Sequence, residues 1–138
     1  EIMPSLVGSE MCIRDRSNHA SVTKYIAAEL AKCNMGEATT MVASDGTGYT
    51  CDGTGTTVSA AAEAALADFK NSYAPANAAV VNAAALVLGQ TSVTNTTSLV
   101  TIVTCFDTKE STDTAGNTSA DCDATSADST MDNTVAIE

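Results

Sequence analysis

The first regular pattern of apolar and polar positions lies in residues 17–36. Apolar side chains recur there at intervals of four, four and three residues: Val22, Ile26, Leu30 and Cys33. This spacing is typical of one buried face of an α-helix. Gly36 can adopt the left-handed conformation that closes a helix, and Asn34 is a second stop signal, so we expect the helix to end near Asn34. Ser17 or Asn18 could cap its start.

A second helical pattern covers residues 57–73. Its apolar residues that share one face are Ala62, Leu66, Phe69 and Tyr73. Thr57 or Ser59 is expected to cap this helix, and Pro75 forbids its continuation. Phe69 and Tyr73 are predicted to anchor it, because burying an aromatic ring removes the most area from water.

The strongest strand signal is residues 98–106, which alternate in the manner of a pleated strand. One side would carry Val100, Ile102 and Phe106, and the other side Leu99, Val103 and Cys105. Residues 89–94 precede it, with a polar break at 95–96, so the two segments predict a hairpin. One side of the hairpin is expected to meet the helices.

The remaining segments are weaker. Residues 39–42 predict a short extended piece, and the glycine-dense stretch DGTGYTCDGTGTT that follows them predicts a loop. Residues 78–88 are ambiguous between helix and strand, and we expect an extended chain from Leu86 only. Residues 107–133 are polar and acidic, as in a loop, and 134–137 could form a last edge strand.

Residues 1–16 differ from the rest in composition. They contain two of the six basic residues and one of the five cysteines. Arg14 and Arg16 follow the short apolar patch, whereas a secretory signal carries its positive charge in front, so this is no working signal peptide. The stretch PSLVGSEMCIRDR resembles a conceptual translation of sequencing-adapter DNA found at the ends of environmental assemblies. We therefore predict that 1–16 is artefactual or disordered, that the authentic N-terminus is missing, and that 17–138 forms a single domain.

Charge narrows the possible partners. The chain carries 17 acidic and 6 basic residues, for a formal net charge of −11. Such a chain repels nucleic-acid phosphate and anionic lipid, so we expect no nucleic-acid partner. There is no run of eighteen apolar residues of the kind that spans a membrane.

The cysteines indicate an oxidising compartment. Setting Cys12 aside leaves an even number in a short, threonine-rich chain: Cys33, Cys51, Cys105 and Cys122. Three pairings are possible. We prefer the local one, Cys33 with Cys51 and Cys105 with Cys122, because each bond closes a short loop and stabilises the fold by about 3 kcal/mol. No two of these cysteines have zinc-knuckle spacing, so no metal site is expected.

Candidate catalytic groups are few. The single histidine, His19, has no serine elbow or cysteine partner, and we expect it to be a solvated helix residue. The glycine-dense loop carries Asp45 and Asp52 but no basic residue, which disfavours phosphate binding. We therefore expect neither enzymatic activity nor a cofactor.

Two weaker possibilities remain. Four aspartates could collect calcium, although their spacing lacks the glycine and glutamate of an EF-hand loop: Asp121, Asp123, Asp128 and Asp132. Asn95 and Asn117 begin glycosylation acceptor sequences, which arise often by accident in so threonine-rich a chain.

The order of these elements resembles the head of a bacterial type IV pilin. The resemblance is carried by NHASVTKYIAAELAKCNMGE, then ALADFKNSY, GQTSV, TIVTCFD and the cysteine-bounded tail. No single one of these stretches is diagnostic, and their order carries the specificity. The family's basic leader, cut after glycine and followed by an apolar helix with an early glutamate, has no counterpart here, because residues 1–16 occupy its place.

The resemblance implies an α+β fold, in which a long N-terminal helix packs on a small antiparallel sheet. A second helix would lie in the connecting loop, and a disulfide-bounded loop would follow the sheet. It also implies a structural subunit of an extracellular pilus that serves adhesion, motility or DNA uptake. The partners would be other subunits, and the missing apolar helix would hold the subunit in the inner membrane before assembly. The alternatives are a type II secretion pseudopilin, or a secreted calcium- or glycan-binding module.

Overall fold

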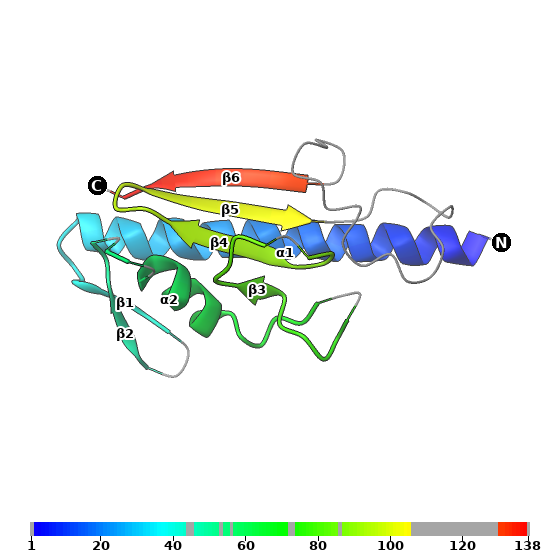
Figure 1. Ribbon diagram of the computed structural model, residues 1–138, viewed down its shortest axis with the longest axis horizontal. Helices are drawn as coiled ribbons and strands as arrows, with labels where there is room; N and C mark the ends of the chain where they lie inside the picture. Colours follow the sequence, from blue (N-terminus) through cyan, green and yellow to red (C-terminus); the bar gives the residue numbers. More distant parts are fainter. Residues whose placement is uncertain are drawn as a thin grey trace.

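The chain folds as a long helix laid along a sheet. The computed structural model describes residues 2–43, 46–52, 54–55, 57–71, 74–85, 87–105 and 130–137, with the backbone alone at 2–13 and 130. The elements in order are α1 (Ile2–Asn34), β1 (Thr40–Val42), β2 (Gly48–Thr50), α2 (Thr57–Ala65), β3 (Val80–Val81), β4 (Thr91–Asn95), β5 (Leu99–Cys105) and β6 (Thr130–Ala136). Helix α2 and the β1–β2 hairpin lie beside the C-terminal end of α1 (Figure 1). The α+β arrangement of a long helix packed on sheets, with a second helix, is confirmed.

The larger sheet has the strand order β3-β4-β5-β6. The predicted hairpin is confirmed, since β4 and β5 pair antiparallel with Val93 opposite Ile102. The predicted last edge strand is also confirmed, but β6 already begins at Thr130, because residues 130–133 pair with β5 instead of belonging to the expected loop. The sheet is not purely antiparallel, since the short β3 runs parallel to β4.

Helix α1 ends where the sequence predicts and begins earlier. The amide of Gly36 donates to the carbonyl of Cys33 and that of Glu37 to the carbonyl of Lys32, each at 3.0 Å, and Gly36 has φ of +73°. Only glycine adopts this conformation without strain, so it closes the helix after Asn34. The helical backbone starts at Ile2, well before Ser17. The artefactual origin of residues 1–16 stays a prediction.

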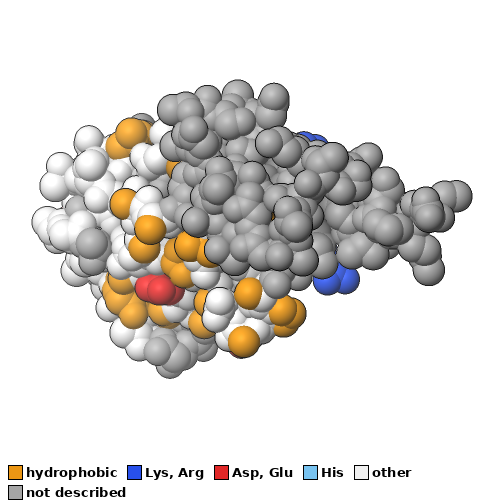
Figure 2. Space-filling view, turned by 45° about the vertical axis from the view of Figure 1, so that its right-hand side comes forward, with side chains coloured by type: hydrophobic (Ala, Val, Ile, Leu, Met, Phe, Trp, Pro, Cys, Tyr) orange, Lys and Arg blue, Asp and Glu red, His pale blue; other side chains and the backbone are white. Residues whose placement is uncertain are grey.

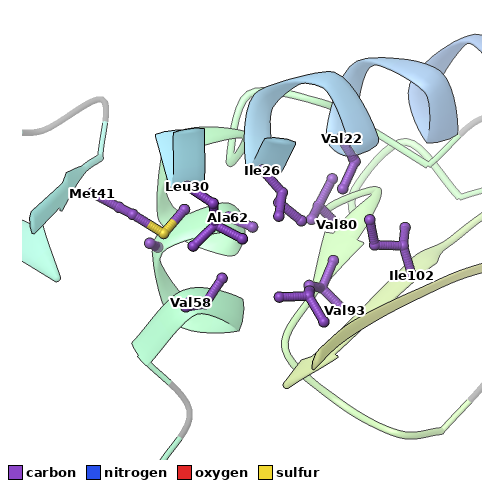
Figure 3. Packing of buried hydrophobic residues seen from close by; sticks show 11 residues of the cluster. Val22, Ile26, Leu30, Met41, Val58, Ala62, Val80, Val93 and Ile102 are labelled. Carbon is purple, nitrogen blue, oxygen red and sulfur yellow. The ribbon is translucent and has the colours of Figure 1, made fainter. Parts of the chain in front are cut away.

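The core lies between α1, α2 and the helix-facing side of the sheet (Figure 3). The predicted stripe of α1 is confirmed, because Val22 and Ile26 are fully buried and Leu30 is 2% exposed. Its partners on the other elements are Met41, Val58, Ala61, Ala62, Val80, Val93, Val100 and Ile102. Burying each of the larger aliphatic side chains contributes about 1.5–3 kcal/mol, which makes this cluster the main source of stability.

Helix α2 is shorter than the predicted 57–73 and ends at Ala65. The following chain turns back on itself, as the amide of Asn71 donates to the carbonyl of Asn77 and that of Ala79 to the carbonyl of Phe69. These bonds replace the continuation of the helix. Phe69 still packs against the core, as predicted, whereas Tyr73 lies outside the described residues.

Two short strands were not predicted. Residues 48–50 of the expected glycine-rich loop form β2, because Tyr49 pairs opposite Met41 and packs against the core. The ambiguous segment 78–88 is extended at Val80–Val81, and Leu86, where we expected the extended chain to begin, lies outside the described residues. Val80 is fully buried, and the Thr91 amide donates to the carbonyl of Ala79 at 2.6 Å.

Candidate functional site: a buried histidine between helix and sheet

His19 lies inside the protein, against the sheet. Asp15 and His19 are each 1% exposed and lie one turn apart on α1, directly before Val22 in the same buried stripe. The prediction of a solvated histidine is wrong, because β5 and β6 cover this part of the helix. The signal was present in the sequence, since the spacing of four and three from Asp15 to His19 to Val22 continues the apolar stripe toward the N-terminus.

Four side chains from four elements form what we call the His19 cluster: His19, Thr91, Thr104 and Asn133. His19 Nδ1 lies 2.8 Å from Thr104 Oγ1, which in turn lies 2.6 Å from Thr91 Oγ1. On the other side of the ring, Nε2 lies 2.7 Å from Asn133 Oδ1. The cluster therefore ties α1 to β4, β5 and β6.

The acceptors determine where the protons lie. Asn133 Oδ1 can only accept, so His19 Nε2 carries the ring proton and donates it. The neutral ring then accepts at Nδ1 from the Thr104 hydroxyl, and the Thr91 hydroxyl donates to Thr104. Every donor in this chain of hydrogen bonds points one way, from β4 through β5 and α1 to β6.

The electrostatic environment favours the neutral ring. Burial lowers the pKa of His19 below its ordinary value, and it outweighs the opposing effects of the hydrogen bond to Asn133 and the charge of Asp132. A hydroxyl beside an imidazole resembles a nucleophile and its base, but His19, Thr91 and Thr104 are each only 1% exposed. In this structure the cluster is therefore an internal connection between α1 and the sheet.

The predicted Cys33–Cys51 disulfide is confirmed. It joins the last turn of α1 to the residue after β2, with the two Cα atoms 6.1 Å apart. Cys105, at the end of β5, is fully buried and disulfide-bonded. Cys122 lies outside the described residues, so the second predicted pairing stays a prediction.

Tyr25 of α1 connects the helix to strand β1. The Tyr25 hydroxyl donates to the carbonyl of Val42 at 3.1 Å, which adds a polar link between α1 and β1. Burial raises the pKa of Tyr25 to about 12, with smaller contributions from the charges of Glu29 and Tyr49.

Asn95 has a structural role that its glycosylation motif did not suggest. Its Oδ1 accepts from the amide of Ser59 and its Nδ2 donates to the carbonyl of Gly55, both at 3.0 Å. Asn95 thus caps the first turn of α2, a function predicted for Thr57 or Ser59. A glycan would be attached through Nδ2, which is engaged in the folded protein. Asn117 lies outside the described residues.

The glycine-dense loop is organised around Asp52. Its carboxylate accepts from the amide and hydroxyl of Thr54 and from the hydroxyl of Thr50, at 2.7–3.0 Å. Hydrogen bonds from Thr54 above all hold the pKa of this carboxyl below its usual value. The loop's polar groups thus serve its own turn. Asp45, the second carboxylate noted in this loop, lies outside the described residues.

Of the four candidate calcium ligands, the structure describes only Asp132. Asp121, Asp123 and Asp128 lie outside the described residues, and Asp132 is exposed on β6. Among the residues that the structure describes, no group of three histidine, cysteine, aspartate or glutamate side chains is placed to hold a metal ion. In the same part of the chain, no helix has the length and apolar character needed to cross a bilayer.

On the face shown in Figure 2, described apolar side chains are visible among polar ones. The large ones that are most exposed are Met35, Val42, Val87 and Leu99, at 38–66%. Apolar side chains that are exposed singly are ordinary on protein surfaces and do not by themselves identify a docking face.

No protein-family model, curated protein or solved structure matches this chain. Its function therefore has to be inferred from its own residues.

Proposed function

We propose that the chain is the head domain of a structural subunit of a type IV pilus-like extracellular filament. The observation that carries this proposal is the placement of α1. Its C-terminal half packs along the sheet, and its axis leads away from the described strands toward the N-terminus (Figure 1). In a subunit that assembles through its helix, the authentic residues before Ser17 would leave the head along this axis.

The way in which the head holds α1 supports a mechanical role. Val22, Ile26 and Leu30 are locked into the core over two turns. The Cys33–Cys51 disulfide then joins the end of the helix covalently to the β1–β2 hairpin. A pull on α1 is therefore shared by the core and by a covalent bond, as a load-carrying subunit requires.

The net charge of the chain leads to a prediction about how the heads assemble. With a net charge of −11, heads that pack side by side repel one another. Salt shortens the range of this repulsion, to about 10 Å at 0.1 M, and divalent cations neutralise it more effectively. We expect salt and magnesium to promote self-association, measured by sedimentation velocity at fixed protein concentration. Self-association that does not change across the titration would count against close-packed acidic heads.

The decisive test is to resequence the source DNA upstream of Ser17 with reads free of adapter. The filament proposal expects the reading frame to continue into about twenty apolar residues with an early glutamate, after a basic leader that ends in glycine. A secretion pseudopilin shares these features, and the neighbouring genes would distinguish it. A genomic reading frame upstream of Ser17 that contains no such apolar run would contradict the filament proposal.

Calorimetry with calcium addresses the competing binding module. Binding that Asp123→Ala abolishes would favour a secreted calcium-dependent module. The filament proposal predicts no heat of calcium binding in this titration.

A further inference from the structure

The apolar stripe of α1 determines which face of the helix meets the sheet, but not how far along the sheet the helix lies. Val22, Ile26 and Leu30 follow one another at intervals of about one turn, and all three are buried aliphatic side chains. A displacement of α1 by one turn, about 5.4 Å along its axis, brings each of them close to the place of its neighbour. Exchanges of one aliphatic side chain for another are the best tolerated changes in a core, so the stripe alone permits more than one register.

The His19 cluster does not tolerate this displacement. His19 continues the stripe, but its ring is bonded at both nitrogens, to Thr104 on β5 and to Asn133 on β6. Moving α1 toward its N-terminus would bring Val22 into the place of the ring, and an aliphatic side chain cannot form either hydrogen bond. Thr104 is 1% exposed, so its hydroxyl would lose the ring as a partner without gaining water.

The opposite displacement is unfavourable for a different reason. It would carry His19 toward the present place of Val22, which lies beside Val80 and Ile102 in the core (Figure 3). The side chains of these neighbours have no hydrogen-bonding atoms, so the ring nitrogens would be buried among apolar groups. The ring therefore fits one position along the sheet.

Buried polar contacts of this kind contribute little net stability. Their hydrogen bonds replace bonds to water in the unfolded chain, and an apolar set of the same shape is often as stable or more stable. What a buried polar contact can provide is a single register, as a buried asparagine does between the helices of a coiled coil.

We propose that the His19 cluster is a register lock, which selects one position of α1 along the sheet among those that the apolar stripe permits. The Cys33–Cys51 disulfide holds the C-terminal end of the same helix, but through the β1–β2 hairpin, which is separate from the larger sheet. His19 joins the middle of α1 to the larger sheet itself. The proposal concerns contacts inside the domain and does not depend on the filament function.

The test removes the polar groups of the cluster and keeps its volume. The background is the double variant Cys33→Ala with Cys51→Ala, in which the disulfide no longer restrains the helix. The apolar replacement adds His19→Leu, Thr91→Val and Thr104→Val to this background, while Asn133 is exposed and becomes hydrated. We expect the urea midpoint of the apolar replacement to equal or exceed that of the background, because no buried polar group of the cluster is left behind.

NMR reports the register directly. In the background, each amide of α1 should give one resonance, and nuclear Overhauser effects should connect the His19 ring with Thr104. In the apolar replacement we expect a second set of resonances for α1, with a displaced population of about 10% or more, against less than about 1% in the background. Methyl groups at position 104 should then show Overhauser effects to Val22 as well as to position 19.

Two matched variants in the same background separate register from stability. Ile26→Val shortens one apolar side chain of the stripe, so it should lower the urea midpoint and keep a single set of resonances. His19→Gln keeps a side chain that both donates and accepts, so it should retain the single register that His19→Leu alone loses.

Three results would overturn the register lock. A single set of resonances with unchanged Overhauser effects in the apolar replacement would mean that the stripe alone sets the register. Two registers in the background would mean that the disulfide sets it. A lower urea midpoint with one register in the apolar replacement would mean that the cluster only stabilises. If the background or the apolar replacement does not fold, His19→Leu in the chain with its disulfides intact decides by the same NMR measurements.

Discussion

Removing the Cys33–Cys51 disulfide tests how the end of α1 is held in the head. The change is the double variant Cys33→Ala with Cys51→Ala. The bond spans a sequence separation of 18 residues, for which loop-closure entropy predicts a stabilisation of about 3 kcal/mol at 25 °C. Both cysteines also pack against the core, so their truncation adds a smaller loss.

The assay is urea unfolding followed by circular dichroism. We expect the free energy of unfolding to fall by about 3 kcal/mol, out of the 5–15 kcal/mol typical of such a domain, so the variant should still fold. The slope of free energy against urea should rise, because an unfolded chain without this cross-link exposes more surface. The double variant is a cleaner test than a reductant, which would also break the disulfide of Cys105.

Met35→Ala is the matched control. Met35 lies two residues beyond Cys33 and is 66% exposed, so its truncation should change the free energy of unfolding by less than about 0.5 kcal/mol. A loss below about 1 kcal/mol in the double variant, with an unchanged slope, would refute the reasoning. It would mean that the core alone holds the helix end and that the unfolded chain gains little freedom.

Three further changes test the core, the helix cap and the pH dependence. Ile26→Ala leaves a cavity at a fully buried position and should lower the free energy of unfolding in urea by about 2–5 kcal/mol. Lys24→Ala, on the exposed side of α1, should lower it by less than about 0.5 kcal/mol. Equal losses in the two variants would contradict the packing of α1. Asn95→Ala removes the acceptor of the Ser59 amide and should lower the free energy of unfolding by about 1–2 kcal/mol. Asn95→Asp should lower it less, because its carboxylate can still cap α2. The pKa of Tyr25 is raised from 10.0 to about 12 in the folded state, so stability should be lost as pH rises between these values; an ultraviolet titration in which every tyrosine ionises near pH 10 would contradict this.

Where prediction succeeded, the signal was local. The spacing of Val22, Ile26 and Leu30 and the stop at Gly36 place one helix face and its end, because both depend on residues within a few positions. Alternation placed the β4–β5 hairpin for the same reason. The Cys33–Cys51 pairing followed from loop length, which is also a property of the chain alone.

Where prediction failed, distant contacts decided. The pattern of residues 57–73 fits a longer helix than α2, but Phe69 and Asn71 form backbone hydrogen bonds with Ala79 and Asn77 instead of continuing the helix. Strand β3 forms because Val80 packs into the core and the Thr91 amide donates to the carbonyl of Ala79. Neither contact can be predicted from residues 78–88 alone. A short apolar run is compatible with either helix or strand until its neighbours are known.

Local patterns were sufficient to predict the apolar face of α1, the β4–β5 hairpin and the covalent closure of the chain by cysteines. The hydrogen-bond partners of His19 and Asn95, in contrast, depend on the complete fold. Each side chain is polar and would be solvated in an isolated element, and each becomes a structural contact because partners 36 to 114 residues away meet it. Local patterns record which surfaces avoid water, whereas the pairing of a buried polar group depends on which atoms the complete fold brings within hydrogen-bond distance.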